Sequence, residues 1–480
     1  MKKILIFVLI AAMILGLCAC GGAGKDKDQL KVGFGRVSIL PKVQVNLDGG
    51  DIEGRPASDP IDDIAATCIA ISQGDETILI YTLDLLLVQK TLLPAQELIT
   101  EATGVPAENI ILNTTHTHSA PAYNHTSGEA YRQPLYQACA DAAVAAIEDL
   151  SPAQIEYGST ETESLTFVRH YRLEGGEIYG THQSLRYTSK GPIQVKEHLY
   201  DANETLQVIK FIREAEDKKD VVMMNFGSHP TIVSGNHRFA LSADWPGAAR
   251  AYVEENTDSL CAVFQAGGGD QAPSSSVPNT SLFKGANEHR DMGAALGEYC
   301  VNILNGEMTK ADGSGITLTT KQFTGATNKE GLDDASLMAS ASAIKEVERQ
   351  YGSSSEEVRQ AVVSSTFESY YHANALLNRA KFPETLTMDL HALVINGVSM
   401  IFAPYEMFGG MGAYITENSP YDMTFVVSCS ESFEGHLGYI PTVYGYENNF
   451  YEYAQARFAR GTAEEVAKLH VEMLNEIKNG

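Results

Sequence analysis

The sequence predicts an α/β protein in which a mixed β-sheet core is surrounded by helices within a single large domain. Three observations predict this fold. Short runs rich in β-branched and aromatic residues alternate along the chain with amphipathic stretches of helical length. The 480 residues are 44% hydrophobic and 20% charged, which is ordinary for a globular chain that buries a large core. No stretch rich in Pro, Gly and Ser divides the chain into separate domains.

The strands are predicted from short runs of Val, Ile, Thr, Phe and Tyr that are bounded by turn residues. In chain order the predicted strands are 29–39, 64–71, 77–83, 110–114, 155–159, 206–212, 221–226, 262–265, 392–395, 398–402 and 423–429. The helices are predicted where apolar residues recur at helical spacing. In chain order they are 93–103, 131–148, 245–255, 286–304, 335–351, 355–380 and 463–478. The segment 328–383 is helix-rich and charged, and we expect it to be an excursion on the outside of the domain.

The N-terminus has the pattern of an export signal. Two lysines precede an apolar run at 4–17, which is too short to span a membrane comfortably. The sequence LCAC at 17–20 resembles the bacterial lipobox, so Cys20 is predicted to be the lipidated new N-terminus that anchors the protein to the membrane. The alternative is a plain cleaved signal peptide. The predicted division of the chain is a signal peptide at 1–19, a flexible tether at 20–30 and the catalytic domain at 31–480, exported across the cytoplasmic membrane and held in the cell envelope.

The composition also limits the partners. With 35 Lys and Arg against 61 Asp and Glu, the formal net charge is −26, which disfavours binding to nucleic acid. Beyond the leader the five cysteines are widely spaced, odd in number and mostly in apolar surroundings, so they are predicted to be buried free thiols. They are Cys68, Cys139, Cys261, Cys300 and Cys429.

The first candidate site residues follow the predicted strand 110–114, where the sequence at 113–121 reads NTTHTHSAP. In an extended chain, side chains two positions apart point to the same side, so His116 and His118 are expected to project together. Two imidazoles at the end of a strand form half of a divalent-metal site. By itself this pattern is weak, because many histidines are simply satisfied polar residues.

Further polar residues come where other predicted strands end. His229 follows the strand 221–226, and Pro230 fixes the turn after it. Asp270 follows the strand 262–265 and three glycines, a loop that lacks the Lys and Ser/Thr of a phosphate loop. Glu406 lies beyond the strand 398–402. Active-site groups of α/β sheets gather at such strand ends. By contrast, Asp244 before a Trp-Pro pair is expected to cap the helix 245–255.

Taken in order, these segments resemble one family. The chain carries HTHS at 116–119, SHPT at 228–231, SADWPG at 242–247, GGDQAP at 268–273, PYE at 404–406 and GYIPT at 438–442. This ordered set resembles the neutral/alkaline, non-lysosomal ceramidase family, and the resemblance extends from about residue 31 to the final helix. Each motif alone is weak, but the ordered set is specific.

The resemblance implies a zinc site and a role for each matching residue. The zinc ligands of the family correspond to His116, His229, Glu406 and Tyr439. Two imidazoles and a carboxylate are a common catalytic zinc set that leaves room for water. His118 corresponds to a histidine placed for hydrogen bonding or proton transfer, Arg169 to an arginine that contacts substrate, and Tyr451 to a second active-site tyrosine. Asp270 and His118 are the candidates for carrying the proton to the leaving amine.

The chain departs from the family pattern at positions that bear on mechanism and substrate. Studied members carry a serine, sometimes proposed as nucleophile, where this chain has Ala266, and an asparagine commonly precedes the matched arginine where this chain has Val168. The expected reaction is therefore hydrolysis of an N-acyl amide, such as that of ceramide or a ceramide-like lipid, by metal-activated water. One alternative is a zinc hydrolase of another amide or ester of the cell envelope. The other is a non-catalytic solute-binding lipoprotein, which predicts two comparable lobes.

Overall fold

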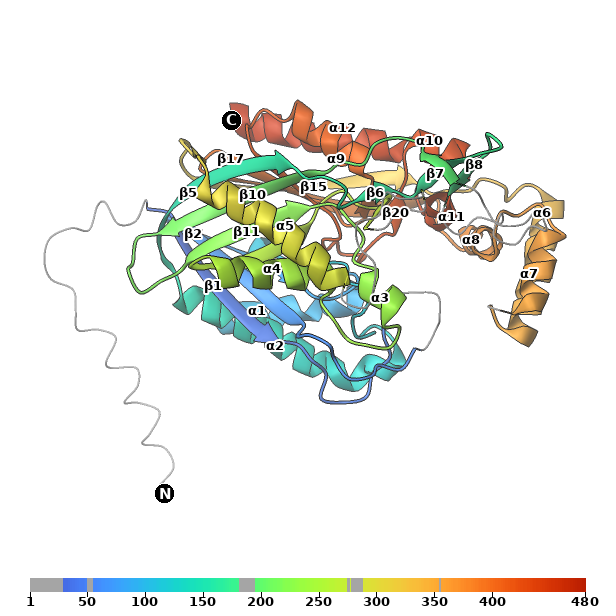
Figure 1. Ribbon diagram of the computed structural model, residues 1–480, viewed down its shortest axis with the longest axis horizontal. Coiled ribbons are helices and arrows are strands. Elements are labelled where there is room, and N and C mark those ends of the chain that lie inside the picture. The colour runs from blue at the N-terminus through green and yellow to red at the C-terminus, as the bar shows by residue number, and fades with distance from the viewer. Residues whose placement is uncertain (1–28, 50–54, 181–194, 274–276, 278–287, 354) are drawn as a thin grey trace, which may run out of the picture.

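The computed structural model describes residues 29–49, 55–180, 195–273, 277, 288–353 and 355–480. Two β-sheets pack face to face, and helices cover their outer sides (Figure 1). The contact between the sheets is apolar: Phe211 and Phe264 come from the larger sheet, and Phe402 and Phe425 from the smaller one. These layers confirm the predicted α/β class with a mixed sheet in a single domain.

The larger sheet has nine strands in the order β12-β11-β10-β5-β1-β2-β3-β4, with β14 paired to β5. Its neighbours are antiparallel except for the parallel pairs β11/β12 and β3/β4. The strands are β1 (Lys31–Ser38), β2 (Ala65–Gln73), β3 (Glu76–Leu83), β4 (Ile110–Ile111), β5 (Ser151–Glu161), β10 (Thr205–Arg213), β11 (Asp220–Phe226), β12 (Ser259–Gln265) and β14 (Thr309–Lys310).

The smaller sheet has four strands in the order β15-β16-β17-β19. They are β15 (Ile316–Ala326), β16 (Thr385–Ile395), β17 (Val398–Phe402) and β19 (Thr424–Val427). Short strands pair around the candidate site: β6 (Phe167–Val168) with β13 (Gln271–Ala272), β18 (Glu406–Met407) with β20 (Tyr439–Ile440), and β7 (His170–Leu173) with both β8 (Ile178–Gly180) and β9 (Val195–His198).

The helices fall into groups that bury different sheet faces. Pro94–Thr103 (α1) and Glu129–Glu148 (α2) pack on β1 to β3, and Asp244–Asn256 (α4) and Glu288–Asn305 (α5) pack on β10 to β12. Gly409–Asn418 (α9) and Thr462–Asn479 (α12) cover the smaller sheet (Figure 1). Three short helices lie in the connections: α3 (Ile232–Asn236), α10 (Val443–Glu447) and α11 (Tyr451–Gln455). Three 3₁₀ turns span Lys90–Leu92, Ala107–Asn109 and Thr126–Gly128.

The segment 328–383 contains three helices that lie at one side of the layers (Figure 1). They are α6 (Ala335–Tyr351), α7 (Glu356–Val363) and α8 (Tyr370–Arg379), and they share a small apolar core that includes Ile344, Val358 and Leu376. Helix α8 packs against α11, where Arg379 Nη1 donates to the Tyr453 hydroxyl at 2.9 Å. The helical segment therefore adjoins the part of the chain that carries Tyr451.

The prediction of one continuous helix over 355–380 is wrong. The structure has two helices, α7 and α8, separated by residues 364–369. The sequence there is SSTFES, and the Ser369 side chain accepts from His372 N–H as the N-cap of α8. Serine and threonine hydroxyls compete with the helical backbone for hydrogen bonds, which favours a break and a new start.

The larger sheet curls until strands near its two ends touch. Thr82 Oγ1 on β3 donates to the Val263 carbonyl on β12 at 2.7 Å, although these strands stand almost at opposite ends of the strand order. At the same place the chain after β4 joins the two sheets, because Thr114 bridges to Leu83 and Asn113 bridges to Ser430. The loops after β4, β11 and β12 therefore emerge close together.

The predicted signal peptide, Cys20 and most of the tether lie outside the described residues, so the lipid anchor stays a prediction. Within the described ranges, no helix has both the length and the apolar character needed to cross a membrane. The five cysteines beyond the leader are buried and free, as the sequence predicted.

Glycines on β1 allow α2 to approach the sheet closely. A Cβ atom at Gly35 would collide with the Ala142 carbonyl oxygen of α2, so Gly35→Ala is expected to lower the free energy of unfolding by about 1–3 kcal/mol. Gly410→Ala on α9 is the control, because no atom lies within 4 Å of the added Cβ, and it is expected to leave stability equal or slightly higher. Urea unfolding of the two variants measures the difference, and equal stabilities would contradict the packing argument.

Candidate metal centre

His116 lies just after the segment that joins the two sheets through Asn113 and Thr114. Its backbone adopts a left-handed conformation with φ 66°, which is costly for a residue with a Cβ and marks a constrained position. Its Nδ1 lies 2.9 Å from the Leu86 carbonyl, so this nitrogen carries the proton and donates. Its Nε2 is buried and has no hydrogen-bond partner among the described residues. This ring nitrogen is therefore not engaged by a hydrogen bond from these residues and is available to a ligand in the site.

His229 is oriented in the same way by a different loop. Its Nδ1 lies 2.8 Å from the Gly268 carbonyl and 3.0 Å from the Gln271 carbonyl, so Nδ1 donates and Nε2 is left to accept. The Nε2 atom lies 3.1 Å from Glu406 Oε2 and 3.1 Å from the Tyr439 hydroxyl. A backbone carbonyl that fixes the tautomer of a histidine is the usual arrangement behind a metal-binding imidazole.

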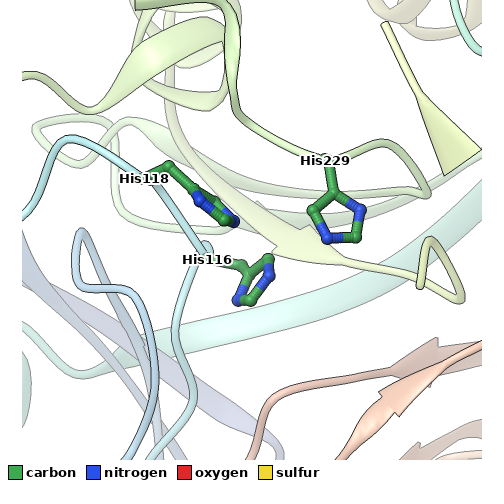
Figure 2. A group of neighbouring side chains, drawn as sticks. All are labelled: His116, His118 and His229. Carbon is green, nitrogen blue, oxygen red and sulfur yellow. The ribbon is translucent and has the colours of Figure 1, made fainter. Parts of the chain in front are cut away.

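His118 completes a group of three imidazoles (Figure 2). Its ring centroid lies 5.0 Å from that of His116 and 5.6 Å from that of His229. One ligand nitrogen from each histidine lies within 4.8 Å of the others. The two rings of the His-Thr-His sequence do converge, but not through an extended chain as the sequence argument assumed, because the left-handed turn at His116 sets their directions.

Glu406 and Tyr439 are brought together by a two-residue parallel pairing. Strand β18 pairs with β20 in the register that places Glu406 opposite Tyr439. Glu406 Oε2 lies 3.1 Å from Nε2 of both His116 and His229. The contact to His116 is close but outside hydrogen-bond geometry, since that nitrogen has no hydrogen-bond partner. The four residues expected as zinc ligands therefore meet in one place.

In this group one buried carboxylate lies among three imidazoles and shifts their pKa values. Burial raises the pKa of Glu406, but His116 and His229 outweigh it and hold this pKa well below its usual value. Burial works against the charged form of His116, yet the Cys429 sulfur and the Glu406 carboxylate raise its pKa well above the usual value. Burial and the charge of His116 lower the pKa of His118. A buried carboxylate beside two imidazole nitrogens without hydrogen-bond partners among the residues that the structure describes, Nε2 of His116 and Nε2 of His118, suits a divalent ion bound by N and O ligands.

Arg169 lies beside Tyr439, between the short strands β6 and β7. Its Nη2 donates to the Gly269 carbonyl at 2.7 Å and to the Tyr439 hydroxyl at 3.2 Å. The Tyr451 ring lies 6.0 Å from the Tyr439 ring, edge to face. The structure thus places the expected substrate arginine and the second tyrosine next to the proposed zinc ligands.

Asp270 is buried but its carboxylate does not point to the histidines. Its Oδ1 accepts from Gly409 N–H at 2.7 Å, and its Oδ2 accepts from the Tyr200 hydroxyl at 3.1 Å. Burial raises its pKa. Both oxygens of the carboxylate are engaged by these hydrogen bonds, which indicate an anchoring role, and a role in proton transfer stays a prediction.

Sequence reasoning missed several residues that surround this group. Glu452 pairs with Arg169 at 2.7 Å, and His170 and Tyr200 extend the contact. Cys429 lies next to His116 and also has a left-handed backbone, with φ 61°. No spacing or motif distinguishes these residues, although Glu452 directly follows the expected site residue Tyr451.

Comparison with solved structures identifies the class of fold. The crystal structure of neutral ceramidase from Pseudomonas aeruginosa superposes with a TM-score of 0.68, at 17% sequence identity over 94% of this chain and 75% of that chain. A ceramidase complexed with C2 gives a TM-score of 0.68 at 16% identity, with the same coverage. This chain therefore has the fold of these ceramidases. No protein-family model matches the sequence, and the comparison with curated proteins finds no match.

Proposed function

We propose that this protein is a zinc-dependent amidohydrolase that cleaves the N-acyl amide bond of ceramide or a ceramide-like lipid. One observation carries the proposal: Nε2 of His116 and Nε2 of His229 both lie 3.1 Å from Glu406 Oε2, beside the Tyr439 hydroxyl. The fold shared with two ceramidases supports the substrate class. The single layered domain of the described residues disfavours the solute-binding alternative, which predicted two comparable lobes.

The residues that would hold the ion are His116, His229, Glu406 and Tyr439, with His118 close enough to contribute. When bound, zinc supplies a water with a lowered pKa and polarises the amide carbonyl. The protein's own groups then bind and orient the substrate. Arg169 and Tyr451 lie beside Tyr439, which supports the proposal that they bind a polar lipid headgroup or the amide oxygen by hydrogen bonds.

Proton transfer to the leaving amine is proposed for His118. Its Nε2 is buried, has no hydrogen-bond partner in the described part of the chain and faces the other two imidazoles. From this position the ring could take the proton released by the attacking water and pass it to the leaving amine. Because Ala266 stands where related enzymes carry serine, no acyl-enzyme on that side chain is available and direct attack by water is proposed.

The export signal and the anchor at Cys20 are also part of the proposal, and they rest on the sequence alone. They would place the catalytic domain on the outer face of the cytoplasmic membrane, next to lipid substrates. The proposed partners are thus a lipid amide and the membrane through the acyl anchor, without nucleic acid.

Metal analysis and lipid hydrolysis test the proposal together. The purified protein is expected to carry about one zinc per chain, to hydrolyse ceramide, and to lose both zinc and activity on dialysis against a chelator. Adding zinc back should restore turnover.

The substrate panel separates the alternatives. Hydrolysis of ceramides, other lipid amides and lipid esters, measured under the same conditions, shows which bond is cleaved. Turnover of esters alone would favour the alternative of a zinc hydrolase that acts on another substrate of the cell envelope. A metal-free protein that binds these lipids without cleaving them would contradict the proposal.

A further inference from the structure

Glu452 is a buried carboxylate that the proposed mechanism does not use. It lies on α11, and its side chain is 1% exposed. Its Oε1 accepts from Arg169 Nε at 2.7 Å, and its Oε2 lies 3.0 Å from His170 Nε2. Burial opposes ionisation, but Arg169 and His170 lower the pKa of Glu452 to about 2. The side chain is therefore an anion held between two basic groups.

Arg169 connects this carboxylate to the candidate metal centre. Its Nε faces Glu452, while its Nη2 donates to the Tyr439 hydroxyl at 3.2 Å and to the Gly269 carbonyl at 2.7 Å. Its backbone N–H donates to the Asp270 carbonyl at 2.9 Å. A guanidinium is planar, so fixing one edge against Glu452 fixes the direction in which the other edge donates.

His170, which contacts the other carboxylate oxygen of Glu452, is also held in place by its neighbours. His170 stacks on Phe450 with ring centroids 3.8 Å apart, and its Nδ1 lies 2.6 Å from the Tyr200 hydroxyl. That hydroxyl donates in turn to Asp270 Oδ2. A chain of hydrogen bonds thus runs from the Glu452 carboxylate through His170, Tyr200 and Asp270. It ends at the Gly409 N–H on α9. Glu452 cannot turn away from Arg169 without breaking several buried contacts.

We propose that Glu452 is a positioning residue that holds Arg169 so that its guanidinium donates to the Tyr439 oxygen and prepares that oxygen to bind the metal. A donor on one side of a phenol oxygen leaves its lone pair for a cation on the other side and stabilises negative charge there. The inference deepens the proposed function and rests on its assignment of Tyr439 as a zinc ligand. It assigns Glu452 a role in metal affinity that needs no contact with the metal.

Zinc affinity, measured by competition with a chromogenic chelator, tests this role without requiring any substrate. Glu452→Gln keeps the shape of the side chain but removes its charge, and is expected to weaken zinc binding about tenfold, as loss of an outer partner does. Tyr439→Phe is expected to weaken binding by at least as much. Because Glu452 acts through Tyr439, the double variant should bind zinc no more weakly than Tyr439→Phe alone.

Matched controls separate positioning from general damage. Asp149→Asn removes another carboxylate that binds an arginine, Arg213, away from this centre, and it should leave zinc affinity unchanged. If Glu452→Gln does not fold, Glu452→Asp keeps the charge with a shorter reach and should show a smaller, equally non-additive loss. Additive losses, or unchanged zinc affinity in a folded Glu452 variant, would overturn the inference, as would a wild-type protein that binds no zinc. Zinc binding with these effects but without ceramide hydrolysis would contradict only the proposed function.

Discussion

Replacing His229 by alanine is expected to abolish zinc binding and amide hydrolysis together. His229 Nε2 faces both Glu406 and the Tyr439 hydroxyl, and its Nδ1 is fixed by backbone carbonyls, so the variant loses an oriented ligand from the centre of the proposed site. Loss of a ligand should cost more than loss of an outer partner, and we expect kcat/KM to fall by about 10³-fold or more.

The measurement is zinc content by elemental analysis beside the rate of ceramide cleavage. His125→Ala is the control because His125 is exposed in a loop outside the group of three histidines, and it should keep both properties. A His229→Ala protein with full zinc content and full activity would remove the metal centre from the proposed function.

Removing the charge of Asp84 is expected to be the most destabilising single change among those considered. Asp84 is fully buried and receives Arg250 Nη2 at 2.6 Å, Arg250 Nη1 at 2.9 Å and Ala65 N–H at 2.8 Å. Asp84→Ala leaves the buried guanidinium uncompensated, so the free energy of unfolding should fall by about 3–5 kcal/mol. Asp84 Oδ1 also accepts from the hydroxyl of Thr115, the neighbour of His116. The loop that carries His116 should therefore loosen as well.

Chemical denaturation measures this effect, with an exposed ion pair as the comparison. Glu356→Gln breaks the exposed pair with Arg359 on α7, where solvent screens the charges, so its loss of stability should be far smaller. If the free energy of unfolding fell by similar amounts in the two variants, burial would not explain how much the Asp84–Arg250 pair contributes to stability.

Much of the fold was predictable because its strands carry strong apolar patterns. Strands such as β3 and β11 were expected within a residue or two at each end, since they are buried on both faces. Strand β15 was missed. Its sequence ITLTTKQFTGA lies at the edge of the smaller sheet and keeps only Phe323 buried, so no alternation of apolar residues marks it.

The candidate site was predictable only in part. The positions of His116, His118 and His229 at strand ends pointed to a shared site, whereas the choice of Glu406 and Tyr439 came from the family resemblance. Their pairing depends on a two-residue parallel bridge between distant segments, which leaves no periodic trace in the sequence. The Glu452 and His170 contacts are likewise made by tertiary packing alone.

The curled sheet also determines when the donors of the proposed metal site come together. His229 is separated from Glu406 by 177 positions and from Tyr439 by 210, so no short segment of the chain contains all of these donors. Closing loops of that length carries an entropic cost that only the completed packing of both sheets offsets. If the proposed site binds a metal, capture would therefore come late in biogenesis, after synthesis has passed Tyr439, and the bound ion would oppose unfolding of the domain by mass action.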